Sequence, residues 1–205
     1  MIGELVRGPD GLRRCGWCVS APDYVEYHDD EWGRPVLEDN KLYEKFCLEG
    51  FQSGLSWLTI LRKREAFRRA FAGFVPERVA RFRVRDVDRL LKDATIVRHR
   101  GKIEATIANA KGTMRAQEQY GSLRALVWSF EPSRRATRAP RRLGDIPAST
   151  AESKALSKEL LRLGFRFVGP TTVYAAMQSL GLVNDHLVGC SARSACSAER
   201  KAIAP

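Results

Sequence analysis

The 205-residue sequence has no run of apolar residues long enough to span a bilayer. Its N-terminus, MIGELVRGPDGLRRC, lacks the apolar core of a signal peptide and is interrupted at Gly8-Pro9. These two absences predict a cytoplasmic protein with no membrane partner.

Cysteine is too scarce for a disulfide framework. The chain has 5 cysteines, an odd number, and nothing in the sequence marks it for secretion. The cysteines are therefore expected either to bind a metal or to lie buried and inert.

Strand-like alternation is also missing, and no internal repeat is found. Helical spacing of apolar residues dominates instead, with Asp39 or Asn40 as a possible N-cap and Ser149 and Glu152 in capping-box spacing. The expected helices cover residues 37–50, 56–71, 84–97, 98–120, 149–164 and 171–181. The sequence predicts an all-α protein.

We expect residues 13–192 to form a single unit, because the length suits one domain with a hydrophobic core. Residues 1–12 and 193–205 are expected to be flexible tails. An arginine-rich stretch at 134–142 is expected to be a loop, which either contacts phosphate or is simply solvated.

Positive charge is abundant. The chain has 35 lysines and arginines against 24 acidic residues, a net charge of +11 and a sequence pI near 9.8. Such an excess favours a polyanionic partner, nucleic acid first, although a compositional bias would produce the same total.

Two histidine and cysteine pairs lie at opposite ends of the sequence. His186 and Cys190 are four residues apart, so a helix would place them on one face. Two ligands do not close a tetrahedral site, and Cys15 and His28 are the natural partners. A site of these four residues would tie the N-terminal segment to the C-terminal one.

Cys18 leaves two alternatives open. Cys15-x-x-Cys18 has the spacing of a zinc knuckle, in which Cys18 would replace His28 as a ligand. The same CGWC motif would be a redox pair in a thioredoxin-like fold, but the strand and βαβ context that this fold requires are absent.

Four tryptophan and tyrosine residues lie within sixteen positions near the N-terminus, and a further tryptophan follows in the QSGLSW motif. Any one of these rings alone would be interpreted as core packing, but the five together in a basic protein favour the walls of a pocket that stacks a planar base. The five residues are Trp17, Tyr24, Tyr27, Trp32 and Trp57.

Glu49 falls on the same helical stripe as Leu42 and Phe46, which places a carboxylate on a buried face. Burying a carboxylate is costly unless it is paired or used, so Glu49 either forms a salt bridge, to Lys45 or to an arginine elsewhere, or has a function. Farther on, LGFRFVGPTT places a Gly169-Pro170 turn between two helices, where backbone N–H groups can bind phosphate.

Together these motifs resemble the bacterial 3-methyladenine DNA glycosylases I, a family of helix-hairpin-helix glycosylases. The resemblance covers about residues 14–190 and rests on six motifs in order: RCGW, YHDDEWG, CLEGFQSGLSW, VRHRGKI, GFRFVG and GLVNDHLVGC. It implies an enzyme that removes 3-methyladenine from alkylated double-stranded DNA, acts as a monomer and leaves an abasic site.

The resemblance implies one structural zinc ion, bound by Cys15, His28, His186 and Cys190. It also implies that Glu49 hydrogen-bonds the excised base. The aromatic residues would then form the pocket: Trp57 stacks on the base, Tyr27 lines the pocket, and Tyr24, Trp17 and Trp32 complete its walls.

DNA contacts are expected in three places. Gly54 and Leu55, directly before Trp57, are candidates for a wedge that fills the gap left by a flipped base. The backbone is expected to be contacted by two further groups: Arg98, Arg100 and Lys102 in the RHRGK cluster, and Gly169 and Thr171 in the hairpin.

Many helix-hairpin-helix glycosylases carry a catalytic aspartate where this chain has Asn184, with Asp185 next to it. A cationic lesion is already a good leaving group, so the site can work without a strong base. The alternative is a zinc-containing protein of the same fold that binds DNA structures without catalysis.

Overall fold

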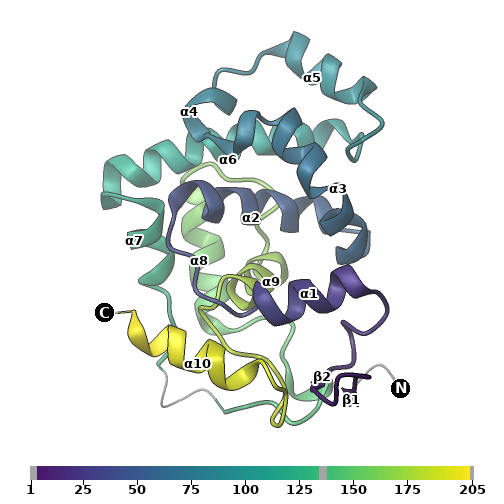
Figure 1. Ribbon diagram of the computed structural model, residues 1–205. Coiled ribbons are helices and arrows are strands. Elements are labelled where there is room, and N and C mark those ends of the chain that lie inside the picture. Colours follow the sequence, from purple (N-terminus) through teal and green to yellow (C-terminus); the bar gives the residue numbers. More distant parts are fainter. Residues whose placement is uncertain (1–3, 134–137, 204–205) are drawn as a thin grey trace.

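The computed structural model describes residues 4–133 and 138–203 (Figure 1). Its long helices are α2 (Asp39–Gln52), α3 (Trp57–Ala70), α6 (Arg100–Tyr120), α8 (Ala151–Arg162), α9 (Pro170–Ser179) and α10 (Arg193–Ala202). Shorter ones are α1 (Pro22–Asp30), α4 (Pro76–Val79), α5 (Val84–Lys92) and α7 (Leu123–Trp128), with 3-10 turns at Ala72–Phe74 and Leu143–Asp145. The prediction of a mostly helical fold is confirmed, and none of the described helices could cross a membrane.

The expectation of a chain without strands was wrong at the N-terminus. Strands β1 (Leu5–Arg7) and β2 (Arg13–Cys15) pair antiparallel, with Leu5 opposite Cys15. Each strand has only three residues, too short to show a period of two in the sequence. Within the two ranges expected to be tails, the structure therefore has β1 and the whole of α10, and both elements lie near one end of the molecule (Figure 1).

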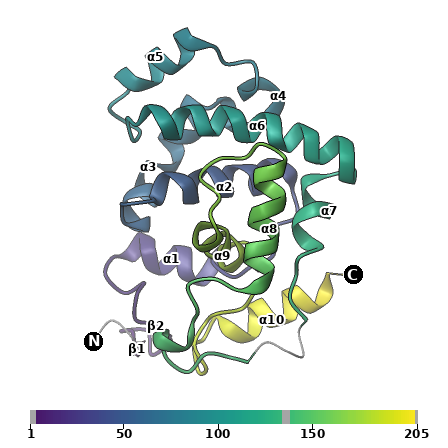
Figure 2. The same ribbon diagram turned by 180° about the vertical axis from the view of Figure 1, so that it is seen from behind.

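Helix α2 crosses the middle of the molecule and is packed on several sides by α3, α6, α7 and α9. All but one of its residues from Leu42 to Phe51 are buried, so the amphipathic stripe seen in the sequence is widened into an almost fully enclosed helix. Figure 2 shows α8 beside α9, in agreement with their extensive contacts, and residues 163–169 connect the two. A side chain on the α9 side of α2 thus points into the interior.

The helix starts differ from the expected ones. Asp39 is the first residue of α2 rather than a cap for it, and its carboxylate accepts hydrogen bonds from the backbone N–H groups of Leu123 and Arg124 at the start of α7. Thr150, not Ser149, caps α8. In both regions a residue of a type expected at a helix cap accepts hydrogen bonds from helix N–H groups. The helix that Asp39 caps and the residue that caps α8 are nevertheless not the predicted ones, because tertiary contacts decide them.

Candidate functional site

A cavity of about 150 Å³ lies between the segment around α1, helix α2, the first residue of α3 and helix α9. It brings together all five predicted aromatic residues and Glu49, and also Gln52, Ala175 and Gln178, which no sequence motif indicated. The lining residues are Trp17, Tyr24, Tyr27, Trp32, Glu49, Gln52, Trp57, Ala175 and Gln178.

The aromatic walls are formed by rings in contact with one another. Trp17 meets Tyr24 and Trp32 edge-on, with ring centroids 4.9 and 5.1 Å apart. On the other side, the Tyr27 and Trp57 rings lie 5.4 Å apart. Tyr27 and Trp57 are buried, and the other three rings are half-buried, as expected for a wall open on one side.

Glu49 supplies the carboxylate of the cavity. Its side chain is only 5 % exposed, and Oε1 accepts a hydrogen bond from the Ser179 hydroxyl on α9 at 3.2 Å. Burial raises the pKa of the Glu49 carboxyl to about 7, against the opposing influence of the Lys45 ammonium and of that hydrogen bond. Because burial disfavours the ionised form of Glu49, a cationic ligand in the cavity would stabilise that form strongly.

Lys45 lies behind the aromatic wall, one helical turn before Glu49. Its Nζ is 5.0 Å from the centroid of the Tyr27 ring and 4.9 Å from that of the Trp57 ring, and it donates a hydrogen bond to the Tyr27 hydroxyl oxygen at 3.3 Å. Burial lowers the pKa of Lys45, while Glu49 acts to raise it. From the sequence, Lys45 was only a candidate ion-pair partner of Glu49, and its contact with two aromatic rings was not expected, because a lysine in a helix is normally solvated.

A buried hydrogen-bond network adjoins the cavity on the α9 side. Asp185 is 6 % exposed, and its Oδ2 accepts from the Tyr174 hydroxyl at 2.7 Å and from Gln178 Nε2 at 2.8 Å. Asn184, its neighbour, donates to the Arg193 carbonyl and to Ser197 Oγ. Both residues considered for the position of a catalytic acid are thus occupied by protein contacts.

A second cavity, of about 260 Å³, adjoins the first and shares Glu49, Gln52 and Ala175 with it. Gly54, Leu55 and Thr171, three of the predicted DNA-contacting residues, line it. Leu55 is 43 % exposed even though it is apolar, which excludes ordinary core packing at this position.

The RHRGK cluster is only partly at the surface. Arg98 is exposed, whereas Arg100 is exposed but paired with Asp88 at 2.9 Å. Lys102 differs from the expectation, because it is 7 % exposed and its Nζ donates to the carbonyls of Phe51 and Ser53 at 2.9 and 2.6 Å. It binds the C-terminal end of α2, where carbonyl groups have no helical partner.

Gly169 lies at the other expected contact to the DNA backbone. It is exposed, and it is the N-cap residue of α9, directly before Pro170. Thr171 is exposed in the first turn of the same helix. The hairpin between α8 and α9 thus presents the N-terminus of a helix to the outside.

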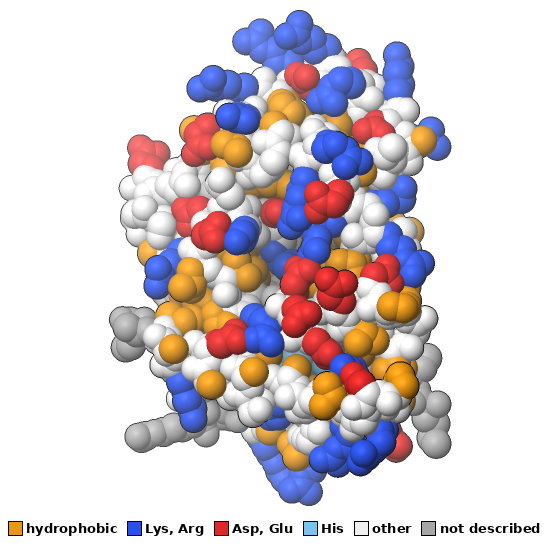
Figure 3. All heavy atoms as spheres, in the orientation of Figure 1, with side chains coloured by type: hydrophobic (Ala, Val, Ile, Leu, Met, Phe, Trp, Pro, Cys, Tyr) orange, Lys and Arg blue, Asp and Glu red, His pale blue; other side chains and the backbone are white. Residues whose placement is uncertain are grey.

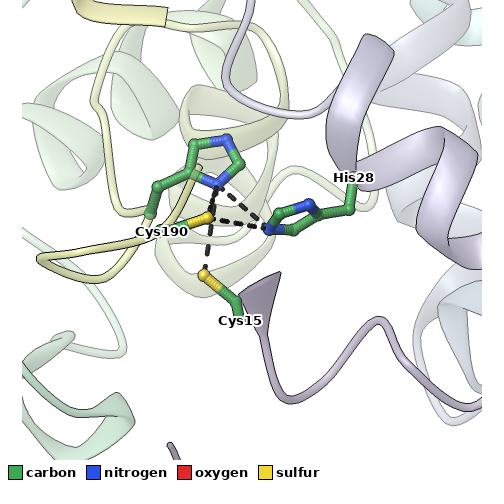
Figure 4. A group of neighbouring side chains, drawn as sticks. Cys15, His28 and Cys190 are labelled. Carbon is green, nitrogen blue, oxygen red and sulfur yellow. Dashed lines mark hydrogen bonds between the residues drawn. The ribbon is translucent and has the colours of Figure 1, made fainter. Parts of the chain in front are cut away.

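The two ends of the chain meet at a buried group of Cys15, His28, His186 and Cys190, whose ligand atoms all lie within 4.8 Å of one another. Figure 4 shows Cys15 from β2, His28 from α1 and Cys190 pointing toward a common centre. His186 Nδ1 is 3.1 Å from His28 Nε2, and Cys190 Sγ is 3.5 Å from both nitrogens. These residues could hold a metal ion.

The donor set and its spacing fit a tetrahedral metal ion. Zinc bonds of about 2.0–2.3 Å imply ligand atoms about 3.3–3.8 Å apart, close to those observed here. The outer atoms are also satisfied: His28 Nδ1 is 2.7 Å from Asp29 Oδ1, and His186 Nε2 is 2.9 Å from the Trp32 carbonyl oxygen. A hydrogen bond with Cys15, and then the two imidazoles, lower the pKa of the Cys190 thiol, which favours the metal-binding thiolate.

Cys18 is buried but is not one of the four converging residues, and its thiol donates to the Cys15 carbonyl at 3.1 Å. His99 also lies apart from the group. It caps α6 by accepting from the Lys102 N–H.

The group of Cys15, His28, His186 and Cys190, called the metal-ligand group below, contacts residues that line the cavity. Trp32, which lines the cavity, bonds His186 through its carbonyl, and the rings of these two residues are 4.6 Å apart. Trp17, two residues after Cys15, packs edge-on against the His28 ring at 5.2 Å. Two of the five aromatic residues of the cavity, Trp17 and Trp32, are therefore positioned by residues of the metal-ligand group.

The surface charge is uneven. Figure 3 shows lysine and arginine side chains over the α4–α5 end and at the opposite end of this face, with acidic side chains near its middle. Some acidic side chains of the molecule are paired, such as Glu31 with Arg64 and Glu44 with Arg68. On this face, the positive side chains are thus concentrated toward its two ends.

Comparison with known proteins identifies relatives over most of the chain. The family described as "Methyladenine glycosylase" matches residues 17–194. The DNA-3-methyladenine glycosylase 1 of Escherichia coli strain K12 is 48 % identical over 179 residues, which cover 87 % of this chain and 96 % of that protein. The DNA-3-methyladenine glycosylase of Haemophilus influenzae is 42 % identical over 181 residues, 88 % of this chain and 98 % of that protein.

Solved structures agree with the sequence relatives. A 3-methyladenine DNA glycosylase I from Staphylococcus aureus, described for its recognition of 3-methyladenine, superimposes with a TM-score of 0.84 at 36 % identity. The match covers 88 % of this chain and 96 % of that one.

Proposed function

The chain belongs to the methyladenine glycosylase family, and on that premise we propose that it is a DNA glycosylase that hydrolyses the N-glycosidic bond of 3-methyladenine in alkylated DNA. The observation that carries the proposal is the cavity in which a buried Glu49 is surrounded by five aromatic residues. This combination suits a planar base that carries positive charge.

The base would be recognised by stacking and by charge. 3-Methyladenine in DNA is a cation, so it gains from the Glu49 carboxylate and from the faces of the Tyr27 and Trp57 rings. Stacking contributes about 1–3 kcal/mol for each base. A neutral adenine would interact less favourably with the Glu49 carboxylate and would compensate less of the free energy needed to desolvate it. The pocket would therefore exclude undamaged bases.

The chemistry would place modest demands on the protein. As the bond between the sugar C1′ and the base breaks, its electron pair neutralises the cationic base, and water adds to C1′ and loses a proton. Asp185 and Asn184 are held by other protein groups. We therefore assign neither residue the role of a general base, and the rate enhancement comes from binding the base in its leaving geometry.

The cavities also suit DNA from which a base has been flipped out. Extruding a base costs a few kcal/mol, and the cost is smallest for a damaged pair. Leu55, exposed at the rim of the second cavity, would fill the gap that the base leaves. The α9 N-terminus at Gly169 and Thr171, with Arg98, would contact the phosphates, whereas Lys102 would serve the fold.

For the metal-ligand group we propose one zinc ion bound by Cys15, His28, His186 and Cys190. With four protein ligands such an ion has no open position, so it would supply structural cross-linking and no Lewis-acid step. We further propose that the protein acts as a monomer.

The test is base release from methylated duplex DNA, with the freed bases identified by chromatography and mass. We expect release of 3-methyladenine with 7-methylguanine left in the DNA. Glu49→Gln should lower the rate at least about 10-fold, the effect of losing about 1.4 kcal/mol of charge interaction. Glu118→Gln, at an exposed position on α6, is the matched control and should leave the rate unchanged.

Three other outcomes would revise the proposal. Release of both methylated bases would mean a broader pocket. Binding of the DNA without release of any base would identify a non-catalytic DNA-binding protein. Full activity of Glu49→Gln would leave the enzyme in place but remove Glu49 from base recognition.

A further inference from the structure

Gln178 combines two features that no other described residue of the cavity shows. It lines the pocket beside Glu49, and its amide has one fixed orientation. Its Nε2 donates to Asp185 Oδ2 at 2.8 Å. An ionised carboxylate accepts hydrogen bonds but cannot donate one, so the reverse orientation of the amide would place two acceptors against each other.

Asp185 is itself held in place. Its Oδ2 also accepts from the hydroxyl of Tyr174, which lies one helical turn before Gln178 on α9. Asp185 is almost completely buried, so water does not compete effectively for this contact. The carboxylate therefore fixes which end of the Gln178 amide remains available.

The available end is an acceptor. Oε1 of Gln178 accepts no hydrogen bond from any residue that the structure describes. On the same helix, the next residue, Ser179, donates to Glu49 Oε1 at 3.2 Å. Helix α9 thus positions two acceptors at one cavity, the carboxylate of Glu49 and the amide oxygen of Gln178.

We propose that Gln178 is a second base-reading residue, whose Oε1 accepts one N–H of the exocyclic amino group of the base, and that Asp185 is the positioning residue that orients it. The proposal rests on the proposed function. An exocyclic amino group has two N–H donors, and two acceptors, Glu49 and Gln178, would satisfy both. A base that lacks this group would leave both acceptors unpaired in a buried site, which is unfavourable.

The experiment compares two free bases. 3-Methyladenine and 3-methylpurine, which lacks the amino group, are titrated into the full-length protein, and tryptophan fluorescence or calorimetry gives each Kd. Gln178→Met keeps the length of the side chain and removes the acceptor. We expect it to weaken 3-methyladenine binding about 10-fold, as for one lost hydrogen bond, and 3-methylpurine binding less than about 2-fold.

Asp185→Asn tests the positioning role. This substitution lets the Gln178 amide turn over. The ratio of the Kd for 3-methylpurine to the Kd for 3-methyladenine should therefore fall toward the value found for Gln178→Met. In the Gln178→Met background, Asp185→Asn should change the ratio no further, because it acts only through Gln178. The ratio of two Kd values for one sample does not depend on the fraction of folded protein, so a loss of stability cannot imitate this result.

Gln117→Met is the matched control. Gln117 also donates its amide to a carboxylate, Asp39 Oδ2 at 2.9 Å, but it lies outside the cavity. It should change the melting temperature and leave both Kd values at the wild-type level.

Equal weakening of both bases by Gln178→Met would overturn the inference, and so would a further change of the ratio by Asp185→Asn in its background. The proposed function is judged separately, by whether the wild-type protein releases 3-methyladenine from DNA. Because free-base binding is measured without DNA, either result can fail while the other stands.

Discussion

At the scale of single residues, the molecule concentrates its unusual chemistry on α2 and α9. Glu49 and Lys45 lie one turn apart on α2, and Gln178 and Ser179 are adjacent on α9. Each of these four polar side chains contacts another polar group or an aromatic face, so the polar groups at the cavity are held in place by protein contacts. Such a site is expected to lower the free energy of unfolding of the unliganded protein, and binding of a ligand is expected to raise it again.

The cost of Glu49 should be measurable as a pH dependence of stability. Burial raises its pKa from 4.5 to about 7, so the folded state holds the proton more tightly than the unfolded state. The favourable contribution of the protonated form is complete below pH 4.5 and is lost as the pH rises through 7. The full difference is about 3 kcal/mol, because one pKa unit corresponds to about 1.36 kcal/mol.

We therefore expect Glu49→Gln to be more stable than the wild type above pH 7, by up to about 3 kcal/mol, and the advantage to shrink toward pH 4.5. Urea unfolding at a series of pH values measures it. Glu118→Gln, at an exposed position, should differ from the wild type by less than about 0.5 kcal/mol throughout. A Glu49→Gln advantage that is constant with pH would mean that the carboxyl is not desolvated in solution.

Most of the candidate site could be predicted at this scale, because its residues belong to sequence motifs. The structure brings the predicted aromatic residues and Glu49 together in one cavity, and the four predicted metal ligands together in a separate buried group. Lys45, Gln178 and Lys102 were missed or misassigned, because their roles depend on which side chain from a distant segment lies beside them. No periodicity encodes that a lysine will meet two rings or two carbonyl groups.

At the scale of elements, the connections between helices matter as much as the helices. After α9 the chain turns at Gly181 and packs against the segment that follows α1, where Val36 N–H donates to the Leu180 carbonyl at 3.1 Å. Gly181 has a φ of +79°, and a Cβ there would lie 2.6 Å from the Arg34 carbonyl carbon and 2.7 Å from Pro35 N. Both neighbours are backbone and cannot move aside independently.

Gly181→Ala should therefore destabilise the protein by about 3 kcal/mol or more, since a left-handed φ costs about 1–2 kcal/mol and the overlap adds to it. Gly54 is the matched comparison, because its φ is +81° and a Cβ there would meet no atom within 4 Å. Gly54→Ala should lose only the conformational part, about 1–2 kcal/mol. Thermal or urea unfolding of both variants decides the matter, and equal losses would show that the contact with residues 34 and 35 is relieved.

Helix boundaries were less predictable than helix existence for the same reason. The segment 84–97 was expected to be one helix, but α5 ends at Lys92, and Asp93 instead accepts from the Thr95 N–H in a turn. The three-residue strands β1 and β2 gave no periodic signal at all. Short elements and helix ends are decided by local hydrogen bonds and tertiary partners, which a pattern of apolar residues does not contain.

At the scale of the whole molecule, the metal-ligand group joins segments that are 171 residues apart, since Cys15 from β2 meets His186 near the C-terminus. The same group supports Trp17 and Trp32 of the cavity through ring contacts and a carbonyl hydrogen bond. Removing the proposed zinc ion should thus affect both stability and base binding. It should affect the N-terminal elements more than the core around α2, which has its own apolar packing.

We expect native mass spectrometry to find one zinc ion per chain, lost in Cys15→Ser and retained in Cys18→Ser. The second variant is the control, because Cys18 is equally buried and only three residues away but lies outside the converging group. Cys15→Ser or chelation should lower the free energy of unfolding by several kcal/mol, since a ligand at 1,000 times its Kd stabilises the folded state by about 4.1 kcal/mol.

Loss of the zinc ion should increase hydrogen exchange in β1, β2 and α1 before it does so elsewhere. It should also weaken 3-methyladenine binding, and more so as a larger fraction of the protein loses the ion. Loss of zinc from Cys18→Ser would move the fourth ligand from His28 to Cys18. A protein that is stable and metal-free would leave the junction of the two ends to apolar packing and to hydrogen bonds such as that of Ser191 N–H to the Arg13 carbonyl at 2.8 Å.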